Sequence, residues 1–439
     1  MSRTSGLMRI DSLLAYLAAE TTALPAEQVA LAGLEWRSHA GRTVASPLNA
    51  ALALPPFDVA AMDGWAVRAA DLRGVSGDAP AELPVDGDAA AGGSDGAPLA
   101  EGACRRISTG ARIPMGADAV VPVEQTCIAD PRSGATRLER VPIELPRSIW
   151  FAESVKPGAA IRRRGEDVLP GDALLAPGDL LDSGSIAVAA GSGATSISLA
   201  PRPRVAIITT GDELSTAIPD TNGPLLEAML EAEGARIVVR QRLRDDAAAT
   251  LAAVRTAARE SDLVVTTGGV SVGPHDHVGA AIAGVFETIV WRLAIQPGKP
   301  LVLGLRRPGM PGAQWAFGLP GNPVSAYVTA HELVLPTLRT MQGRPPQALE
   351  ERGQLDTAVE SPVGRRSYLR LAARRDPSGA PVRDGSGAVV VGPAGAQGSH
   401  QASILAQTDY LGIVAEEMSG LAAGDEILLH PLPRAGRRR

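Results

Sequence analysis

The segment from Arg204 to Thr267 constrains the fold of this 439-residue chain more than any other part of the sequence. It begins with the uninterrupted apolar run RVAIITT, which is typical of a strand buried on both faces of a parallel sheet. After it the spacing predicts, in order, a helix over Asn222–Gly234, a strand over Ile237–Val239, a helix over Asp246–Arg259 and a strand over Leu263–Thr267. This alternation indicates right-handed βαβ units and therefore an α/β domain with a parallel sheet.

The ends of these elements locate candidate binding loops. Asn222 is the expected N-cap of the first helix, and Gly234 is its expected C-terminal stop. Ligands of such sheets bind beyond the carboxyl ends of the parallel strands. The loops Thr210–Leu214 and Thr267–Asp276 each follow a predicted strand, so they are the places where a site is expected.

The regions on either side of this segment have a different pattern of apolar residues and glycines. Asp11–Ala19 carries leucines at helical spacing and predicts a short amphipathic helix. Elsewhere short apolar runs alternate with glycine-rich turns, which indicates β modules. These regions are Leu52–Val141, Phe151–Leu199 with a helix expected from about Ser183 to Ala190, and Gly353–Leu432.

Composition excludes several classes of protein. The net charge of −6 argues against a general nucleic-acid binder, although it is compatible with a small anionic ligand in a locally positive pocket. Cys104 and Cys127 are the only cysteines, too few for a disulfide framework or a four-cysteine metal site. No secretion signal is visible near the N-terminus, and no apolar run reaches the ~18 residues needed to cross a bilayer. We therefore expect a cytoplasmic protein without nucleic-acid or membrane partners.

The loop TTGGVSVGPHD follows the strand that ends at Thr267. Gly268, Gly269 and Gly273 allow backbone N–H groups to approach a ligand closely, and Ser271 adds a hydroxyl. These features favour a phosphate cradle over the alternative, a sharp turn that uses glycine only for its backbone freedom. The loop has neither the P-loop nor the dinucleotide-binding spacing.

Polar residues in three further loops leave two interpretations open. Asp212 and Glu213 follow the first strand; they could hold Mg²⁺ on a phosphate or simply complement a helix N-terminus. The loops IQPGKP and LPGNPVSAY, which carry Lys299, Asn322 and Ser325, are either rigid binding loops or ordinary surface turns. Because only Lys156 and Lys299 are lysines, Lys299 suggests a need for a compact ammonium group.

Ten segments, taken in chain order, resemble the molybdopterin molybdenumtransferase family, which includes the MoeA proteins and the matching domain of gephyrin. They are FDVAAMDGWAV, ISTGARIPMGADAVVPVE, RRRGEDV, VAIITTGDEL, DTN, LRDD, TTGGVSVGPHD, WRLAIQPGKP, LPGNPVSAY and VGPAGAQGSH. The order is far more specific than any one segment.

The resemblance implies a multidomain fold of α/β and β parts. Its expected domains are an elongated N-terminal domain at 1–50 and 148–200, an inserted β-rich domain at 51–147, the α/β molybdopterin-binding domain at 201–343 and a C-terminal β-barrel-like domain at 344–434. The arginine-rich composition of the last residues separately predicts a disordered tail at 435–439. It also implies a homodimer with each active site shared between two chains. Molybdopterin adenylyltransferase and molybdoenzymes are the transient partners that it suggests.

The implied reaction inserts molybdate into adenylylated molybdopterin, with Mg²⁺-dependent hydrolysis of the adenylate and release of AMP. The resemblance gives catalytic roles to Asp63, Asp167, Glu213 and Asp276, with Glu213 and Asp276 as the Mg²⁺ ligands. The cofactor-binding positions that it implies are Thr109, Thr210, Gly211, Asp212, Asp245, Gly268, Gly269, Ser271, Lys299, Pro300, Asn322, Ser325, Arg370 and Ser399. Molybdate and phosphate need cations and N–H or O–H donors of the kind that these residues offer.

Three departures from the family pattern keep other functions open. Val59 and Ala60 replace a polar pair, Gln296 replaces a lysine, and GSH at 398–400 stands where GSG is usual. These changes would suit a carrier that binds the finished cofactor without catalysis, whereas the retained acids favour the enzyme. Molybdopterin adenylyltransferase activity is a third hypothesis, which the long flanking domains disfavour.

Overall fold

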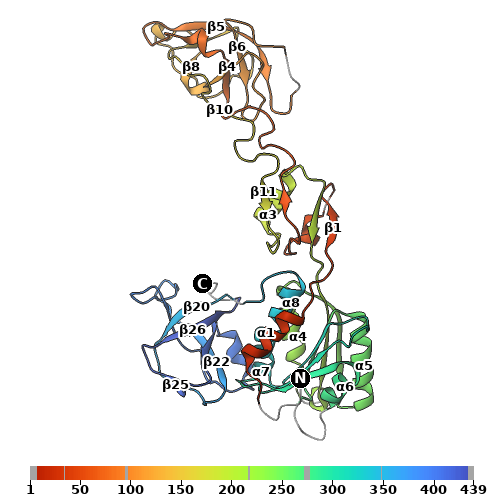
Figure 1. Ribbon diagram of the computed structural model, residues 1–439. Coiled ribbons are helices and arrows are strands. Elements are labelled where there is room, and N and C mark those ends of the chain that lie inside the picture. The colour runs from red at the N-terminus through yellow and green to blue at the C-terminus, as the bar shows by residue number, and fades with distance from the viewer. Residues whose placement is uncertain are drawn as a thin grey trace.

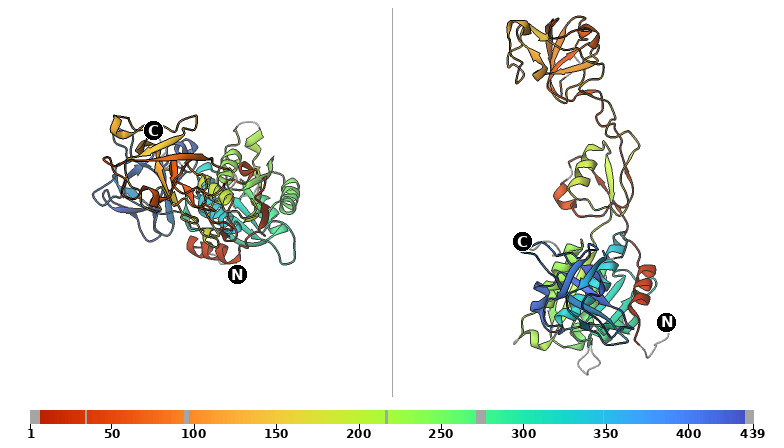
Figure 2. Two further views of the ribbon diagram at one scale, coloured as in Figure 1. Left: turned by 90° about the horizontal axis from the view of Figure 1, so that it is seen from above. Right: turned by 90° about the vertical axis from the view of Figure 1, so that its left-hand side faces the viewer.

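The computed structural model describes residues 7–33, 35–93, 97–215, 218–270, 277–347 and 349–433. These residues form an elongated molecule with three tiers (Figures 1 and 2). A body at one end holds the α/β domain and the C-terminal β domain, a small module lies in the middle, and a β module forms the far end. The fold is thus the multidomain arrangement of α/β and β parts that the sequence predicts.

The α/β domain is built on one six-stranded sheet in the order β14-β13-β15-β19-β18-β16. Its strands are β13 (Arg204–Thr210), β14 (Arg236–Leu243), β15 (Leu263–Thr267), β16 (Glu287–Arg292), β18 (Pro300–Leu305) and β19 (Trp315–Leu319). The first four strands of the order run parallel, but β18 is antiparallel to β19 and to β16. The expectation of a parallel sheet is therefore wrong at this edge, where short connections return the chain directly.

Helices cover both faces of this sheet because β13 sends alternate apolar side chains to each side. One face packs against α5 (Ala247–Glu260) and α6 (His277–Val285). The other packs against α4 (Asn222–Ala232) and a continuous helix made of α7 (Pro323–Thr329), the π turn η5 (Ala330–Val334) and α8 (Leu335–Met341). Asp246 caps α5 by accepting a bond from the backbone N–H of Ala249, as expected from an aspartate at that position.

The first helix, α1 (Ile10–Glu20), lies in the body and not in the middle module. Ile10, Leu13 and Leu17 are buried in the core of the α/β domain, and Trp315 donates a hydrogen bond of 2.9 Å to Thr21. The expected assignment of residues 1–50 to the elongated N-terminal domain is therefore wrong for this helix. Helical spacing predicts the apolar stripe but not the domain that covers it.

The middle module is made by two stretches of chain that run out from the body and back. β1 (Glu27–Ala30) pairs with β12 (Ser196–Leu199), and β2 (Leu48–Asn49) pairs with β11 (Ala173–Leu175). The module also contains α2 (Trp36–His39) and α3 (Ser183–Gly191), the second of which the sequence predicts.

The β module at the far end has a six-stranded sheet in the order β7-β4-β6-β5-β9-β8. Its strands are β4 (Gly64–Val67), β5 (Ala81–Ala89), β6 (Cys104–Ile107), β7 (Ala119–Pro122), β8 (Thr126–Cys127) and β9 (Ser148–Phe151), with short 3-10 turns η1 (Ala69–Leu72), η2 (Val123–Gln125) and η3 (Pro131–Ser133). The pair β3 (Val59–Ala60) and β10 (Ile161–Arg162) forms its base. The expected boundary at residue 147 is too early, because β9 pairs with β5 and β8.

The C-terminal domain is a closed five-stranded barrel in the order β22-β23-β20-β26-β24 and back to β22. The strands are β20 (Glu351–Leu355), β22 (Arg366–Ala373), β23 (Val389–Pro393), β24 (Tyr410–Val414) and β26 (Glu426–Pro431), accompanied by η6 (Ala402–Ala406) and the pair β21 (Val359–Glu360) with β25 (Gly420–Leu421). From the α/β domain, β17 (Ile295–Gln296) pairs with β22 and joins the two domains. The expected tail at 435–439 lies outside the described residues, and no described helix is long and apolar enough to cross a membrane.

Candidate functional site

Three loops meet at the carboxyl edge of the parallel strands. A β-carbon on Gly268 would overlap the carbonyl oxygen of Thr210, and one on Gly321 would lie 3.5 Å from the Cα of Gly268. Gly268 and Gly269 also have positive φ values of 91° and 57°, which disfavour other residues. The glycines are therefore needed both for the turn and for the close contact of the strand ends β13, β15 and β19.

Two buried polar atoms at these loops have no hydrogen-bond partner among the described residues. They are the hydroxyl of Thr210 and the side-chain oxygen of Asn222. The amide nitrogen of Asn222 donates to Thr267 Oγ1 at 2.9 Å and to the carbonyl of Gly321 at 2.7 Å, which ties α4 to two of the loops. A buried polar atom without a partner needs an explanation, and a polar ligand at this edge would supply one.

Asn222 is therefore not the N-cap that the sequence predicts. Thr221 precedes the helix, and Asp220 accepts a hydrogen bond of 2.9 Å from the backbone N–H of Gly223. The side chain of Asn222 points instead to the strand ends, a role that sequence reasoning missed. Its position directly after the strand-end loop was the signal that could have revealed it. By contrast, Gly234 has a φ of 94° beyond the end of α4, as its predicted role as a stop requires.

Acidic residues surround the loop after β13. Asp212 and Glu213 are exposed in the short turn η4 (Asp212–Ser215), and Asp212 accepts a hydrogen bond of 3.2 Å from the backbone N–H of Asp245. The carboxylate of Glu213 folds back over Gly211, where a β-carbon would lie 2.6 Å from Oε1. Oxygen donors of this kind fit a hard divalent cation such as Mg²⁺. Ser271 and Asp276 lie outside the described residues.

A second group of predicted residues gathers around the start of α7. Asn322 donates to Ser399 Oγ at 3.1 Å, and the backbone N–H of Val324 donates to the carbonyl of Ser399 at 3.1 Å. The loop that leads to the exposed Lys299 and to Pro300 packs against the same helix, because a β-carbon on Gly298 would come within 2.5 Å of Thr329. Ser325 is buried in this helix. Because Asn222 binds Gly321, and Asn322 follows it directly, this group adjoins the glycine loops.

Arg370 holds the loop that carries Ser399, one member of this second group. Its guanidinium is almost fully buried and donates to the carbonyl oxygens of Tyr368, at 2.8 Å, and Gln397. Burial lowers the pKa of Arg370 to about 10. Because these bonds hold the 395–399 loop, the side chain orients Ser399.

The predicted acids of the β module lie far from the glycine loops of the same chain. Asp63 accepts hydrogen bonds from the backbone N–H and the hydroxyl of Thr109 at 2.6 and 2.9 Å. Asp167 is exposed, and its backbone N–H donates to Leu54 at 3.0 Å. Both acids flank the base of the β module, and the middle module separates this base from the body (Figure 2).

The pKa of Asp63 is lowered by the hydrogen bond from the backbone of Thr109 and, next, by the bond from its hydroxyl. In Thr109→Ala only the hydroxyl bond is lost, so the pKa of Asp63 is expected to rise part of the way toward its ordinary value. A lowered carboxyl pKa stabilises the fold above the ordinary pKa of the group, and this stabilisation is lost as the pH falls through the lowered pKa. Because the pKa of Asp63 is higher in the variant, the variant should lose this stabilisation at a higher pH. NMR titration of the carboxyl carbons measures the shift.

Asp58 provides the internal control for this titration. Its pKa is lowered by bonds from the Arg164 backbone and the Arg163 side chain, neither of which involves Thr109. It should titrate identically in both proteins. An unchanged Asp63 would mean that the backbone bond alone sets its pKa.

The first of the three departures from the family pattern concerns packing positions. Val59 and Ala60 are buried in β3, and Ala60 belongs to the apolar core at the base of the β module. Gln296 is exposed in β17 beside the loop of Lys299. His400, of the third departure, is also exposed and directly follows Ser399, so the second and third changes both alter solvent-facing groups near the predicted oxyanion residues.

Comparison with known proteins agrees with this arrangement. Residues 8–193 match the model of the MoeA N-terminal region (domains I and II), and residues 206–340 match a probable molybdopterin binding domain. The molybdopterin molybdenumtransferase of Haemophilus influenzae is 32% identical over 406 residues, which cover 91% of this chain and 93% of the relative. Molybdopterin molybdenumtransferase 2 of Mycobacterium tuberculosis is 33% identical over 402 residues, covering 88% and 91%.

The fold has a counterpart among solved structures. The crystal structure of a molybdopterin biosynthesis MoeA protein from Pyrococcus horikoshii superposes with a TM-score of 0.75 at 26% identity and covers 97% of this chain and 99% of that one. Sequence and fold therefore agree over nearly the whole length. The chain belongs to the molybdopterin molybdenumtransferase family, a transferase family of molybdenum cofactor biosynthesis.

Proposed function

We propose that this chain inserts molybdate into adenylylated molybdopterin, with hydrolysis of the adenylate and release of AMP. The observation that carries the proposal is the buried, unpartnered hydroxyl of Thr210 at the meeting point of the glycine loops. A phosphorylated pterin offers the acceptor oxygens that this hydroxyl and the adjoining backbone N–H groups need.

The two groups of residues at the edge of the sheet divide the work. Thr210, Gly211, Gly268 and Gly269, with Ser271, bind the pterin phosphate. Molybdate, a substrate, binds next to them, where Lys299 supplies a positive charge and Asn322, Ser325 and Ser399 supply polar groups. Arg370 positions Ser399, because two nitrogens of its guanidinium donate to backbone carbonyls, one of them that of Gln397 in the loop of Ser399.

The acids act on the adenylate. Glu213 and Asp276 would hold a Mg²⁺ ion, which supplies charge neutralisation at the phosphate to be cleaved. Asp63 stays ionised because Thr109 holds it, and together with Asp167 it orients the attacking water. Since the middle module keeps these two acids away from the loops of their own chain, they serve the site of a partner. We therefore propose a homodimer in which the base of each β module meets the α/β domain of the other protomer.

The cellular setting follows from this chemistry and is part of the proposal. A cytoplasmic adenylyltransferase must supply the adenylylated pterin, and molybdoenzymes must receive the product. Each contact would be transient.

The reaction itself is tested with purified protein, adenylylated molybdopterin, molybdate and Mg²⁺. AMP release together with cofactor formation is the expected result. Gln296, exposed where the family has a lysine, favours the second candidate, a carrier that binds the finished cofactor. Cofactor binding without AMP release would establish the carrier instead.

Mixing two inactive variants tests the shared site. Asp63→Asn and Glu213→Gln should each lose activity, because each removes a carboxylate from every site. In a mixed dimer, one site carries both changes and the other carries neither. After subunit exchange at equal amounts we expect about one quarter of the wild-type activity, because about half of the dimers are mixed and each has one intact site. A mixture as inactive as its components would show that each site is built within one chain.

A further inference from the structure

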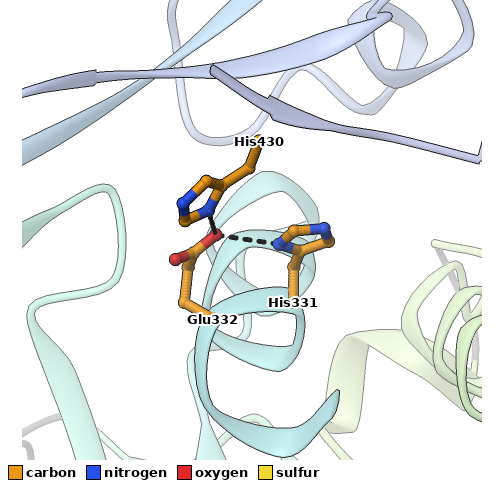
Figure 3. A group of neighbouring side chains, drawn as sticks. All are labelled: His331, Glu332 and His430. Atoms are coloured by element: carbon orange, nitrogen blue, oxygen red, sulfur yellow. Dashed lines mark hydrogen bonds and ion pairs between the residues drawn. The ribbon is translucent and has the colours of Figure 1, made fainter. Parts of the chain in front are cut away.

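Outside the glycine loops, three metal-ligating side chains converge where the α/β domain meets the barrel (Figure 3). His331 and Glu332 belong to the π turn η5, and His430 belongs to β26 of the barrel. We propose that they form a binding site for a divalent transition metal of the zinc class, separate from the Mg²⁺ at the adenylate. This site does not depend on the proposed function, because none of its residues belongs to the pterin or molybdate groups.

The three side chains already converge on one point. Nδ1 of His331 lies 2.8 Å from Glu332 Oε1, and Nδ1 of His430 lies 2.9 Å from the same oxygen. One ligand atom from each residue can be chosen so that all lie within 4.8 Å of one another. Zinc bonds of about 2.0–2.1 Å require neighbouring ligand atoms a little over 3 Å apart, so a small rotation of the carboxylate admits the ion.

Local structure holds the ligands in place. A π turn inside a longer helix is uncommon and frequent at functional sites, and here it brings the adjacent side chains of His331 and Glu332 into contact. The side chains of His331, Glu332 and His430 are only 7%, 4% and 12% exposed. Burial of this kind removes the competing water and limits the motion of the ligands.

Two further residues support the cluster. The buried Tyr368 lies close enough to Glu332 for its phenol pKa to be raised, first by burial and next by the charge of that carboxylate. On the outer side, Glu350 Oε1 lies 3.8 Å from Nε2 of His430. Carboxylates and other polar groups behind the ligands are a regular part of metal sites, because they help to fix the ring orientation and the tautomer.

A pocket gives the cluster a route to solvent. Its volume is about 260 Å³, and its wall contains all three ligands together with apolar residues of α1, among them Leu14 and Leu17. Water or a small oxygen ligand in this pocket can complete a tetrahedron around the ion. Three protein ligands with one open position are typical of zinc sites that keep an exchangeable ligand.

The donor set selects the metal. Two imidazole nitrogens and one carboxylate suit zinc and its neighbours, whereas Mg²⁺ prefers oxygen ligands and retains its waters. Among the described residues, no other group of three such side chains lies so close together. The ion would join the helix of one domain to a strand of the other, so its removal should loosen their interface.

The test is zinc binding to the untagged full-length protein after removal of metal with a chelator. Calorimetric titration with Zn²⁺ alone should give one ion per chain, and bound Co²⁺ should give the intense visible absorption of a tetrahedral site. Glu332→Gln and His430→Asn should each weaken zinc binding by at least about 100-fold. The mid-point of thermal unfolding should rise with zinc in the wild-type protein but not in these two variants.

Two controls separate the site from other sources of binding. His39→Asn changes a histidine that lies 3.1 Å from Arg42 and away from the cluster, and it should bind zinc like the wild type. Glu213→Gln should do so as well, because it alters only the proposed Mg²⁺ site. The proposal is overturned if the wild-type protein binds no zinc, or if the cluster variants bind it as tightly as the His39 variant.

Discussion

Replacing Gly268 by alanine is expected to reduce cofactor formation by at least about 100-fold, because displacing a catalytic loop by about 1 Å is enough for a loss of that size. The new β-carbon would overlap the carbonyl oxygen of Thr210 and come within 2.9 Å of its hydroxyl. The strand ends of β13 and β15 must then separate. That movement displaces the hydroxyl that we assign to the pterin phosphate.

Gly171→Ala is the matched control for this change. Gly171 has nearly the same backbone angle, with φ of 95° against 91°, but no heavy atom lies within 4 Å of the position of its β-carbon. It should share the backbone strain of about 1–2 kcal/mol and keep full activity. Activity assays and calorimetric unfolding of both variants separate strain from contact. Equal activity of the two variants would remove the glycine loop from the proposed site.

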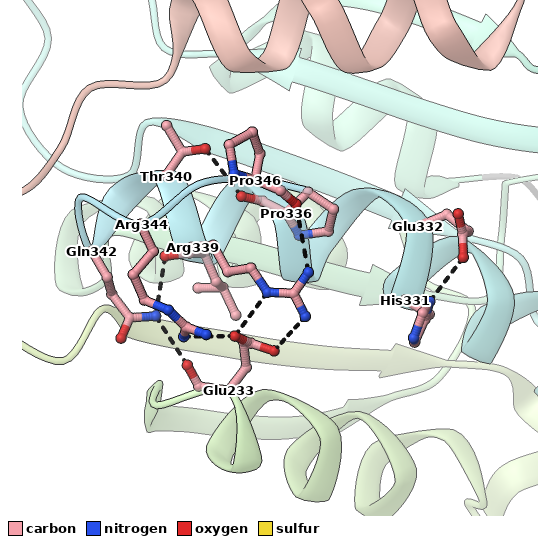
Figure 4. Close-up of polar contacts among 10 residues, drawn as sticks. Glu233, His331, Glu332, Pro336, Arg339, Thr340, Gln342, Arg344 and Pro346 are labelled. Carbon is pink, nitrogen blue, oxygen red and sulfur yellow. Dashed lines mark hydrogen bonds and ion pairs between the residues drawn. The ribbon is translucent and has the colours of Figure 1, made fainter. Parts of the chain in front are cut away.

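Replacing Glu233 by alanine is expected to lower the free energy of unfolding of the α/β domain by about 3 kcal/mol, because it leaves two largely buried cations without their partner. Glu233 follows α4, and its carboxylate accepts bonds from Arg339 at 3.0 and 2.8 Å and from Arg344 at 2.7 Å (Figure 4). Its side chain is 12% exposed, and the two arginines are 15% and 19% exposed. The cluster fastens α4 to the end of α8.

Glu227→Ala removes an ion pair on the same helix but from a more exposed place. Glu227 lies 2.6 Å from Arg240, with side-chain exposures of 33% and 41%. A pair of this kind contributes about 0.5 kcal/mol, so the variant should unfold almost like the wild type. Denaturant titrations of both variants measure the difference. Losses of equal size would show that burial of the Glu233 cluster adds nothing to its strength.

The sequence predicts best those elements that are determined by residues close to them in the chain. The bounds of β13 and β15 agree with the prediction because strands buried on both faces carry continuous apolar runs. The capped start of α5 is equally local, since Asp246 bonds to a backbone only three residues away. Such features depend on neighbours in the chain, and periodicity and capping rules report them directly.

Most of the wrong predictions depend on contacts between distant residues. Leu13 marks a helix face, but nothing near it in the sequence tells that the α/β domain buries it. The β module extends past residue 147 because Ile149 pairs with Leu83, a register that no local pattern specifies. The same limit hid the histidine cluster, in which His430 lies 98 positions from Glu332. The contact of Asn322 with Ser399 was likewise accessible only through the family resemblance.

The position of α1 in the body has a mechanical consequence. The chain leaves the body after this helix and returns to it at β13. Two stretches of chain, each fixed to the body, therefore connect it to the long arm that ends in the β module. A single connecting segment would allow the arm to rotate freely about it. Two connecting segments resist this rotation, so bending is the motion that costs least energy. Asp63 and Asp167, at the base of the β module, are thereby carried along an arc and do not sample every direction. The two connections thus restrict the direction of the β module even if the middle of the arm bends.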